Sequence, residues 1–183
     1  MGGVEPRAEP VLVYVKPLNL RGYGGLVWAN RIRKKLGHTM LPVEMSGNWS
    51  KKLDDFDLRR WYRVAETRRH FLEDVSWDQI GSVIKKRKKL NNGYYPSDVR
   101  SHEMLDQRLE SHDKLFEAIR KDGGLSAAPE HLVQLNISET GGFYFGPGGQ
   151  HRIAMAVVLG FESIPMKLGY VHTKGRGALG QLL

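Results

Sequence analysis

Five glycines fall between Gly141 and Gly149, and they limit the C-terminal third of the chain to short elements joined by tight turns. The apolar alternation before these glycines and the Phe-Tyr-Phe triplet among them predict the two strands of a hairpin. The apolar segment after them ends at Gly160, which is typical of a helix. The pattern predicts strands over residues 131–137, 143–145 and 164–171 and a helix over residues 150–159. These elements indicate an α+β fold with a small mixed sheet.

The chain before this unit is basic, and its pattern predicts mainly helices. Val11–Val15 predicts one short strand, because β-branched residues between prolines favour an extended chain. Helices are predicted over residues 26–36 and 54–73. Ser76 and Gln79 have the spacing of a capping box and predict the start of a third helix.

A turn-forming stretch, Asn91–Ser97, is the best candidate for a domain boundary. After it, residues 98–118 are rich in helix formers, and Ser111 predicts the cap of a helix that ends at Gly123. In this interpretation Asp113 is a first-turn charge that favours the helix dipole. The predicted organisation is a basic, mainly helical N-terminal extension over residues 1–96, an α+β domain over residues 97–172 and a flexible glycine-rich tail over residues 173–183.

The composition excludes several classes of chemistry. The 183 residues include no cysteine, so disulfide frameworks, thiolate metal sites and cysteine nucleophiles are excluded, and we expect neither zinc nor an iron–sulfur centre. The net charge is +8, and residues 1–100 account for it with 20 Lys and Arg against 11 Asp and Glu. This charge favours an anionic partner. The longest apolar run, residues 153–161, is too short for a bilayer, and no secretory signal is visible, so we expect a cytoplasmic protein without a membrane partner.

Three segments occur in an order that is known from one superfamily: Leu115–Gly123, then Gly149–Ala156 after the hairpin, then Leu159–Pro165. With these segments, residues 103–171 resemble the ParB/sulfiredoxin superfamily, and most closely an uncharacterised stand-alone branch of it. The resemblance implies a ParB-like fold and a nucleotide or phosphorylated small molecule as ligand, with ATP or CTP and Mg²⁺ as the candidate cofactors.

The chain departs from the characterised members of that superfamily at three positions. Gln150 stands where sulfiredoxin-like reductases need a cysteine, which excludes their reaction. Gln150 and His151 replace the Glu and the first Arg of the CTP-binding segregation proteins, and Gly148 replaces the Asp of the free-serine kinases.

The segment from Gly146 to Arg152 has the residue types of a phosphate-binding loop. Glycines let backbone N–H groups approach a ligand closely, and the following helix directs its N-terminal N–H groups the same way. The alternative is a tight turn in which the glycines serve backbone geometry only and His151 is structural. The predicted phosphate-binding residues are Gly146, Gly148, Gly149, Gln150, His151 and Arg152.

Acidic residues at the start of the α+β domain are the candidate catalytic groups. Glu103, Asp106 and Glu110 follow helical spacing, so one helix face would present all three carboxylates. The resemblance to the kinases implies that Glu103 or Asp106 holds magnesium or acts as a base, with His151 assisting. The alternative is a solvated helix face.

A basic run offers a different function. Its residues are Lys85, Lys86, Arg87, Lys88 and Lys89. They would contact nucleic-acid phosphates while Trp61, Tyr62, Tyr94 and Tyr95 stack on bases, or the basic half would bind an acidic protein. The alternative is a solvated helix end, with Trp61 and Trp77 in the core.

The sequence thus predicts a binding protein for a nucleotide or another phosphorylated ligand, with a kinase-like phosphotransferase or an NTPase as its enzymatic form. A non-catalytic nucleic-acid-binding protein that uses its basic N-terminal half is the alternative.

Overall fold

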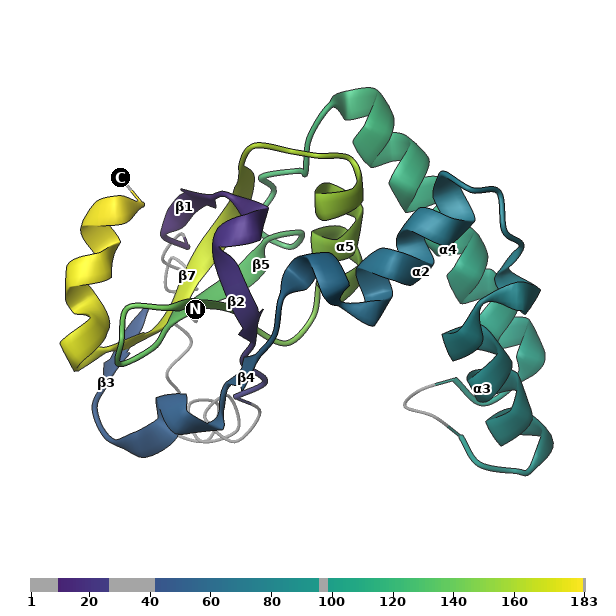
Figure 1. Cartoon of the computed structure of the whole chain (residues 1–183), viewed down its shortest axis with the longest axis horizontal. Helices are drawn as coiled ribbons and strands as arrows, with labels where there is room; N and C mark the ends of the chain where they lie inside the picture. Colours follow the sequence, from purple (N-terminus) through teal and green to yellow (C-terminus); the bar gives the residue numbers. More distant parts are fainter. Residues whose placement is uncertain (1–9, 27–41, 96–98, 183) are drawn as a thin grey trace, which may run out of the picture.

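The structure is a computed structural model, and it describes residues 10–26, 42–95 and 99–182. A mixed β-sheet forms one end of the molecule, and helices extend from it as an arm (Figure 1). The predicted helix over residues 26–36 lies, apart from Leu26, outside the described residues. The strands in the described residues are β1 (Leu12–Val15), β2 (Leu20–Tyr23), β3 (Val43–Met45), β4 (Asp54–Asp55), β5 (Val133–Ile137), β6 (Phe143–Phe145) and β7 (Ile164–His172).

The sheet combines strands from both halves of the chain in the order β1-β7-β5-β6-β2-β4, with β3 also paired to β7. β7 runs parallel to β5, and its other edge pairs first with β1 and then with β3. The hairpin of β5 and β6 is antiparallel, as predicted. The described part of the predicted N-terminal extension is not separate from the sheet, because β1 to β4 belong to it. These short strands are held by hydrogen bonds to distant partners, which a local pattern does not contain.

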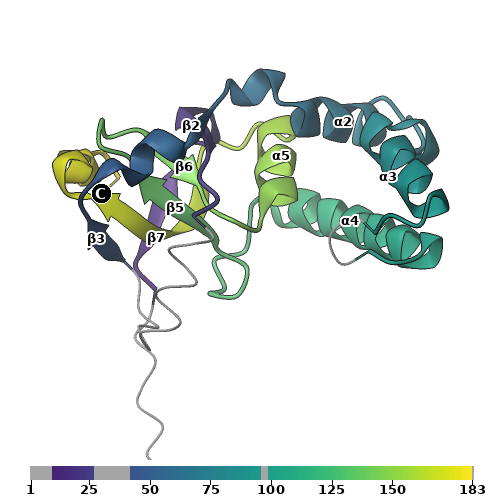
Figure 2. The same cartoon turned by 90° about the horizontal axis from the view of Figure 1, so that it is seen from below.

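Helices cover one face of the sheet and continue away from it. The helices are α2 (Tyr62–Phe71), α3 (Gly81–Asn91), α4 (His102–Asp122) and α5 (Gln150–Val158), with 3-10 turns η1 (Pro17–Asn19), η2 (Asn48–Lys52), η3 (Leu58–Arg60), η4 (Trp77–Gln79) and η5 (Thr173–Gln181). α5 lies between the sheet and α2 to α4 (Figure 2). Its Ile153 and Ala156 are fully buried in one cluster with Leu135 and Ile137 of β5. None of the described helices has the length and apolar character that crossing a membrane requires.

α4 is one continuous helix of 21 residues, so the prediction of a helix start at Ser111 is wrong. Ser101 caps it by accepting a hydrogen bond from the Met104 N–H at 3.1 Å, and the left-handed Gly123 ends it. Ser111 donates its hydroxyl to the Gln107 carbonyl within the helix. Ser76 precedes the short turn η4 without a side-chain capping bond, so the capping-box prediction is also wrong.

η4, α3 and α4 form the part that we call the helical arm, which comprises the described residues 77–95 and 99–122. The arm has its own apolar cluster, which includes Ile80, Val83, Leu105 and Leu109. The second half of α4 packs elsewhere: Phe116 and Ile119 share a cluster with Met155 of α5. The first half of α4 therefore packs within the helical arm, and its second half attaches the arm to α5.

The C-terminal segment forms η5, which packs on the sheet end of the molecule, so the prediction of a flexible tail over residues 173–183 is wrong for the described residues 173–182. Ala178 and Gly175 are buried. A Cβ on Gly175 would lie 1.9 Å from the Ser138 carbonyl oxygen, so glycine is needed for this close approach. Gly175, in a segment whose glycines suggested flexibility, therefore serves packing.

Candidate functional site

The glycine loop before α5 has structural reasons for its glycines. Gly148 and Gly149 both have positive φ, 83° and 72°, and Gly149 is the N-cap of α5. A Cβ on Gly149 would lie 2.4 Å from a methyl carbon of Val133. A Cβ on Gly146 would lie 3.0 Å from the Gln134 side chain. Backbone geometry and packing on β5 thus explain these residues without a ligand.

The three side chains after the glycines point to different surroundings. Gln150 is the first residue of α5 and half-buried. Arg152 donates a hydrogen bond to the His131 carbonyl at 3.0 Å and so links α5 to the segment before β5. The side chain of His151 lies away from both, between α2 and α4. The predicted set from Gly146 to Arg152 therefore does not gather around one point.

His151 is the residue of this set that meets other functional groups. Its Nε2 lies 3.2 Å from Nη1 of Arg63. A guanidinium can only donate, so Nε2 is the acceptor and the ring proton is on Nδ1. The His151 ring also packs against His112 of α4, with the ring centroids 3.9 Å apart.

These residues line a narrow cavity between α2, α3, α4 and α5, which we call the basic cleft. Its interior volume is about 20 Å³, enough for one water molecule. Three cationic side chains, Arg63, Lys86 and Arg108, line it, against one carboxylate, Glu66. The complete lining is Arg63, Glu66, Thr67, Trp77, Ser82, Val83, Lys86, Arg108, Leu109, His112 and His151.

Both histidines of the basic cleft are held neutral. Burial, followed by the effect of His112 and Arg63, lowers the pKa of His151 to about 3. Burial, followed by Lys86 and Arg108, lowers the pKa of His112 to about 4. Near pH 7 the lining therefore consists of two neutral rings, three cationic side chains and one carboxylate among its titratable groups.

Two polar atoms of the basic cleft are buried without a hydrogen-bond partner, namely Nε of Arg63 and Nδ1 of His112. The carboxylate of Glu66 does not satisfy them, because it accepts from the Ser82 N–H at 2.7 Å and so caps the start of α3. A buried polar group left unpaired costs about 1–3 kcal/mol. The cleft therefore offers hydrogen-bonding capacity to a small polar group.

Beside the basic cleft, Asp113 links α4 to α2 and to η4. Its Oδ1 accepts from Nε1 of Trp77 at 2.9 Å and lies 3.1 Å from Nε2 of His70. His70 stacks on Trp77 with the ring centroids 3.8 Å apart. The interpretation of Asp113 as a first-turn charge is wrong, since it lies in the middle of α4 and bonds side chains of other elements.

The acidic candidates, Glu103 and Asp106, lie nearer the N-terminus of α4 than His112 does. Asp106 is six residues before His112, about 9 Å along the helix axis, and its Oδ1 accepts from Nη2 of Arg87 at 2.6 Å. Glu103 is one turn farther away and lies 3.4 Å from the Gln107 amide nitrogen. The structure thus does not bring Glu103 or Asp106 together with His151.

The basic run lies on α3 and divides into two kinds of residue. Lys86 lines the basic cleft, and Arg87 forms ion pairs with Asp78 and Asp106 inside the arm. The remaining residues, Lys85, Lys88 and Lys89, are exposed. Trp61 and Trp77 are partly buried and pack against the apolar clusters, which favours the core interpretation over a recognition surface.

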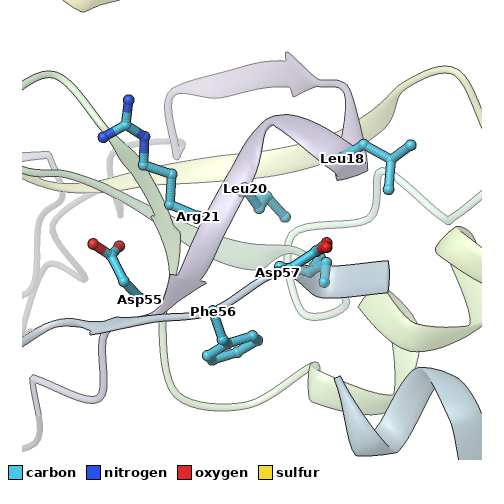
Figure 3. Close-up of a pocket in the computed structure, with 7 residues that line it drawn as sticks. Leu18, Leu20, Arg21, Asp55, Phe56 and Asp57 are labelled. Carbon is cyan, nitrogen blue, oxygen red and sulfur yellow. The ribbon is translucent and has the colours of Figure 1, made fainter. Parts of the chain in front are cut away.

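A larger and more open cavity of about 410 Å³ lies beside β2 and β4 (Figure 3). Arg21 contributes one positive charge and Asp55 and Asp57 two negative charges, so this cavity does not favour an anion. Asp55 accepts a hydrogen bond from the Tyr144 hydroxyl. Burial and this bond raise the pKa of Tyr144 to about 12.

Sequence reasoning missed Arg63, Arg108 and His112 as site residues. Arg108 and His112 are four residues apart on one helix, so their spacing places them on one face and was a usable signal. Arg63 had no comparable signal, because its partner His151 is 88 residues away.

Comparison of the chain with protein-family models, with curated proteins and with solved structures found no match.

Proposed function

We propose that the protein binds the phosphate group of a phosphorylated ligand at the basic cleft, with one phosphate oxygen inside the cavity. The observation that carries this proposal is the pair of buried, unpartnered polar atoms, Nε of Arg63 and Nδ1 of His112, in a cavity of positive charge. Oxygen atoms of a phosphate would accept a hydrogen bond from the Arg63 Nε–H, and from His112 when its ring proton is on Nδ1.

Charge complementarity favours phosphate over a carboxylate. Three cations and one carboxylate line the cleft, and both histidines are neutral. A phosphate monoester carries a charge of about −1.5 to −2 near neutral pH, so a lining with more cations than carboxylates favours it over a singly charged carboxylate. Resemblance of residues 103–171 to the ParB/sulfiredoxin superfamily supports the same ligand class, and it keeps ATP and CTP with Mg²⁺ among the ligands to test.

The proposal is one of binding and not of phosphoryl transfer. A phosphotransferase needs a base or a magnesium ligand beside the transferred phosphate. Asp106 is bound to Arg87, and Glu103 lies still farther along α4 from His112. His151 accepts from Arg63 and is therefore a positioning group for the guanidinium.

The test is calorimetric titration with inorganic phosphate, pyrophosphate, ATP, CTP and GTP, with and without Mg²⁺. For the ligand that binds, we expect Arg63→Gln to weaken affinity about tenfold to a hundredfold, since a hydrogen bond to a charged group is worth about 1.5–3 kcal/mol. Arg69→Gln, an exposed arginine on the same helix, is the matched control and should change affinity little.

A further variant separates the basic cleft from the glycine loop. Arg152→Ala removes the arginine of the predicted loop but leaves the cleft lining intact. Binding that depends on Arg152 and not on Arg63 would contradict the proposal, and so would the absence of millimolar or tighter binding for all five compounds.

A further inference from the structure

The volume of the basic cleft limits what its ligand can be. About 20 Å³ holds one water-sized group, such as a single oxygen atom of a phosphate, and excludes a nucleoside. A ligand would therefore present a terminal phosphate at the cleft while the rest of it lies on the outer surface. The chemistry of that surface then decides which class of phosphorylated molecule fits.

One side of α3 leads from the cleft to the outside. Ser82, Lys86 and Lys89 have i, i+4 and i+7 spacing and so share a side of the helix. Ser82 and Lys86 line the cleft, and Lys89 lies one turn farther on, about 4.5 Å along the axis. The Lys89 ammonium sits over the ring of Tyr94, 5.1 Å from its centroid.

We call this side of α3, with Ser82, Lys86 and Lys89, the α3 track. It combines positive charge with the exposed aromatic surface of the residues that follow the helix. α3 contains no acidic residue, and Asp78 and Asp106 pair with Arg87. None of the ion pairs within the described ranges includes Lys85, Lys88 or Lys89. Tyr94 is 60 % exposed and Tyr95 is 55 % exposed, and both follow the C-terminal end of α3.

We infer that the ligand of the basic cleft is the phosphorylated end of a single-stranded nucleic acid, with the following nucleotides along Lys89 and Tyr94. The inference rests on the phosphate-binding function proposed above. Lysines beside exposed aromatic rings bind single strands, because the ammonium groups contact phosphates and the rings stack on unpaired bases. Bases in a duplex are already stacked and paired, so the tyrosines favour a single strand.

The experiment measures fluorescence anisotropy with a labelled oligothymidylate of about eight nucleotides, within the site sizes of single-strand binders. The strand carries a 5′-phosphate, a 3′-phosphate or hydroxyls at both ends. We expect one phosphorylated form to bind at least about tenfold more tightly than the unphosphorylated strand, and Arg63→Gln to abolish that difference.

Two further variants test the track along α3. Tyr94→Ala should weaken binding of the phosphorylated strand about fivefold or more, which is the lower end of the effect of losing one stacked base. The same variant should leave binding of inorganic pyrophosphate unchanged. Tyr14→Ala, an exposed tyrosine on β1, is the matched control. Lys89→Gln should reduce the salt dependence of strand binding, while Lys121→Gln on the exposed face of α4 should not.

The outcomes distinguish this inference from the proposed function. Equal binding of phosphorylated and unphosphorylated strands, equal competition by a phosphorylated duplex, or unchanged strand binding in Tyr94→Ala would overturn the inference. If pyrophosphate binding still depends on Arg63 in those cases, the phosphate-binding function stands. If no phosphate compound binds in an Arg63-dependent way, the proposed function itself is wrong.

Discussion

Histidines 112 and 151 show how burial and neighbouring charge set the state of single residues. Each ring is buried beside cationic side chains, and each pKa is lowered to about 4 and about 3, respectively. Neutral rings allow the close packing at 3.9 Å and let His151 accept from Arg63. An anion bound beside them would favour their charged forms and so raise both pKa values.

The lowered pKa values predict a loss of stability in acid. The unfolded chain protonates these histidines near pH 6.5, while the folded protein does so only near pH 4 and below. The unfolded state therefore binds more protons in between, and the free energy of unfolding should fall as the pH drops from about 6.5 toward 4. Urea denaturation at several pH values measures this slope.

Substitution identifies the source of that slope. The variant with both His112→Gln and His151→Gln should show a flatter dependence between these pH values than the wild-type protein. His131→Gln, an exposed histidine outside the basic cleft, is the control. Equal slopes in the double variant and the wild type would show that other groups cause the acid sensitivity.

Among the helices, α4 connects two parts of the molecule, because it contributes side chains to two separate apolar clusters. Leu105 and Leu109 pack in the helical arm, whereas Phe116 and Ile119 pack against Phe71 and α5. His112 lies between these two regions and faces the basic cleft. The site is therefore located where the arm meets the body of the molecule.

The arm cluster predicts a large effect for a single truncation. Leu105 is fully buried, so Leu105→Ala should lower the free energy of unfolding by about 2–5 kcal/mol through lost burial and a cavity. The neighbouring Met104 is 43 % exposed, and Met104→Ala should change it by less than about 0.5 kcal/mol. Chemical denaturation of both variants measures the difference, and equal effects would contradict the packing of the arm.

In the whole molecule, the two halves of the chain are interleaved. Strands β1, β2 and β3 pair with strands from residues 133–172, and β4 joins the same sheet through β2. Arg63 and Lys86 from the basic half meet Arg108 and His151 from the nearly neutral half in one cleft. The separation of charge along the sequence is therefore not a separation in space.

The close packing of η5 on the sheet can be tested with two neighbouring glycines. Gly175→Ala places a Cβ against the Ser138 carbonyl and should lower the free energy of unfolding by about 1–3 kcal/mol. Gly177→Ala has no atom within 4 Å of its Cβ and should be close to neutral. Thermal denaturation measures both, and equal melting temperatures would contradict the position of η5.

Elements with strong local signals could be predicted from the sequence alone. The hairpin of β5 and β6, the helix α5 and the strands β1 and β7 depend on apolar periodicity, glycine turns and β-branched runs, all of which are local. Strands β2, β3 and β4 could not, because each has two to four residues and is stabilised by pairing with distant strands. Glycines in η5 suggested flexibility, since a sequence does not show which glycine approaches another backbone.

The sequence by itself determined the α+β class, the absence of cysteine chemistry, the basic character and His151 as a candidate site residue. Only the tertiary structure decided which residues surround that histidine. It turned His151 toward Arg63, His112 and Lys86, and it placed Arg152, Glu103 and Asp106 elsewhere. The physical reason is that a site is made by side chains from helices far apart in the chain, and their contacts depend on packing that no local pattern encodes.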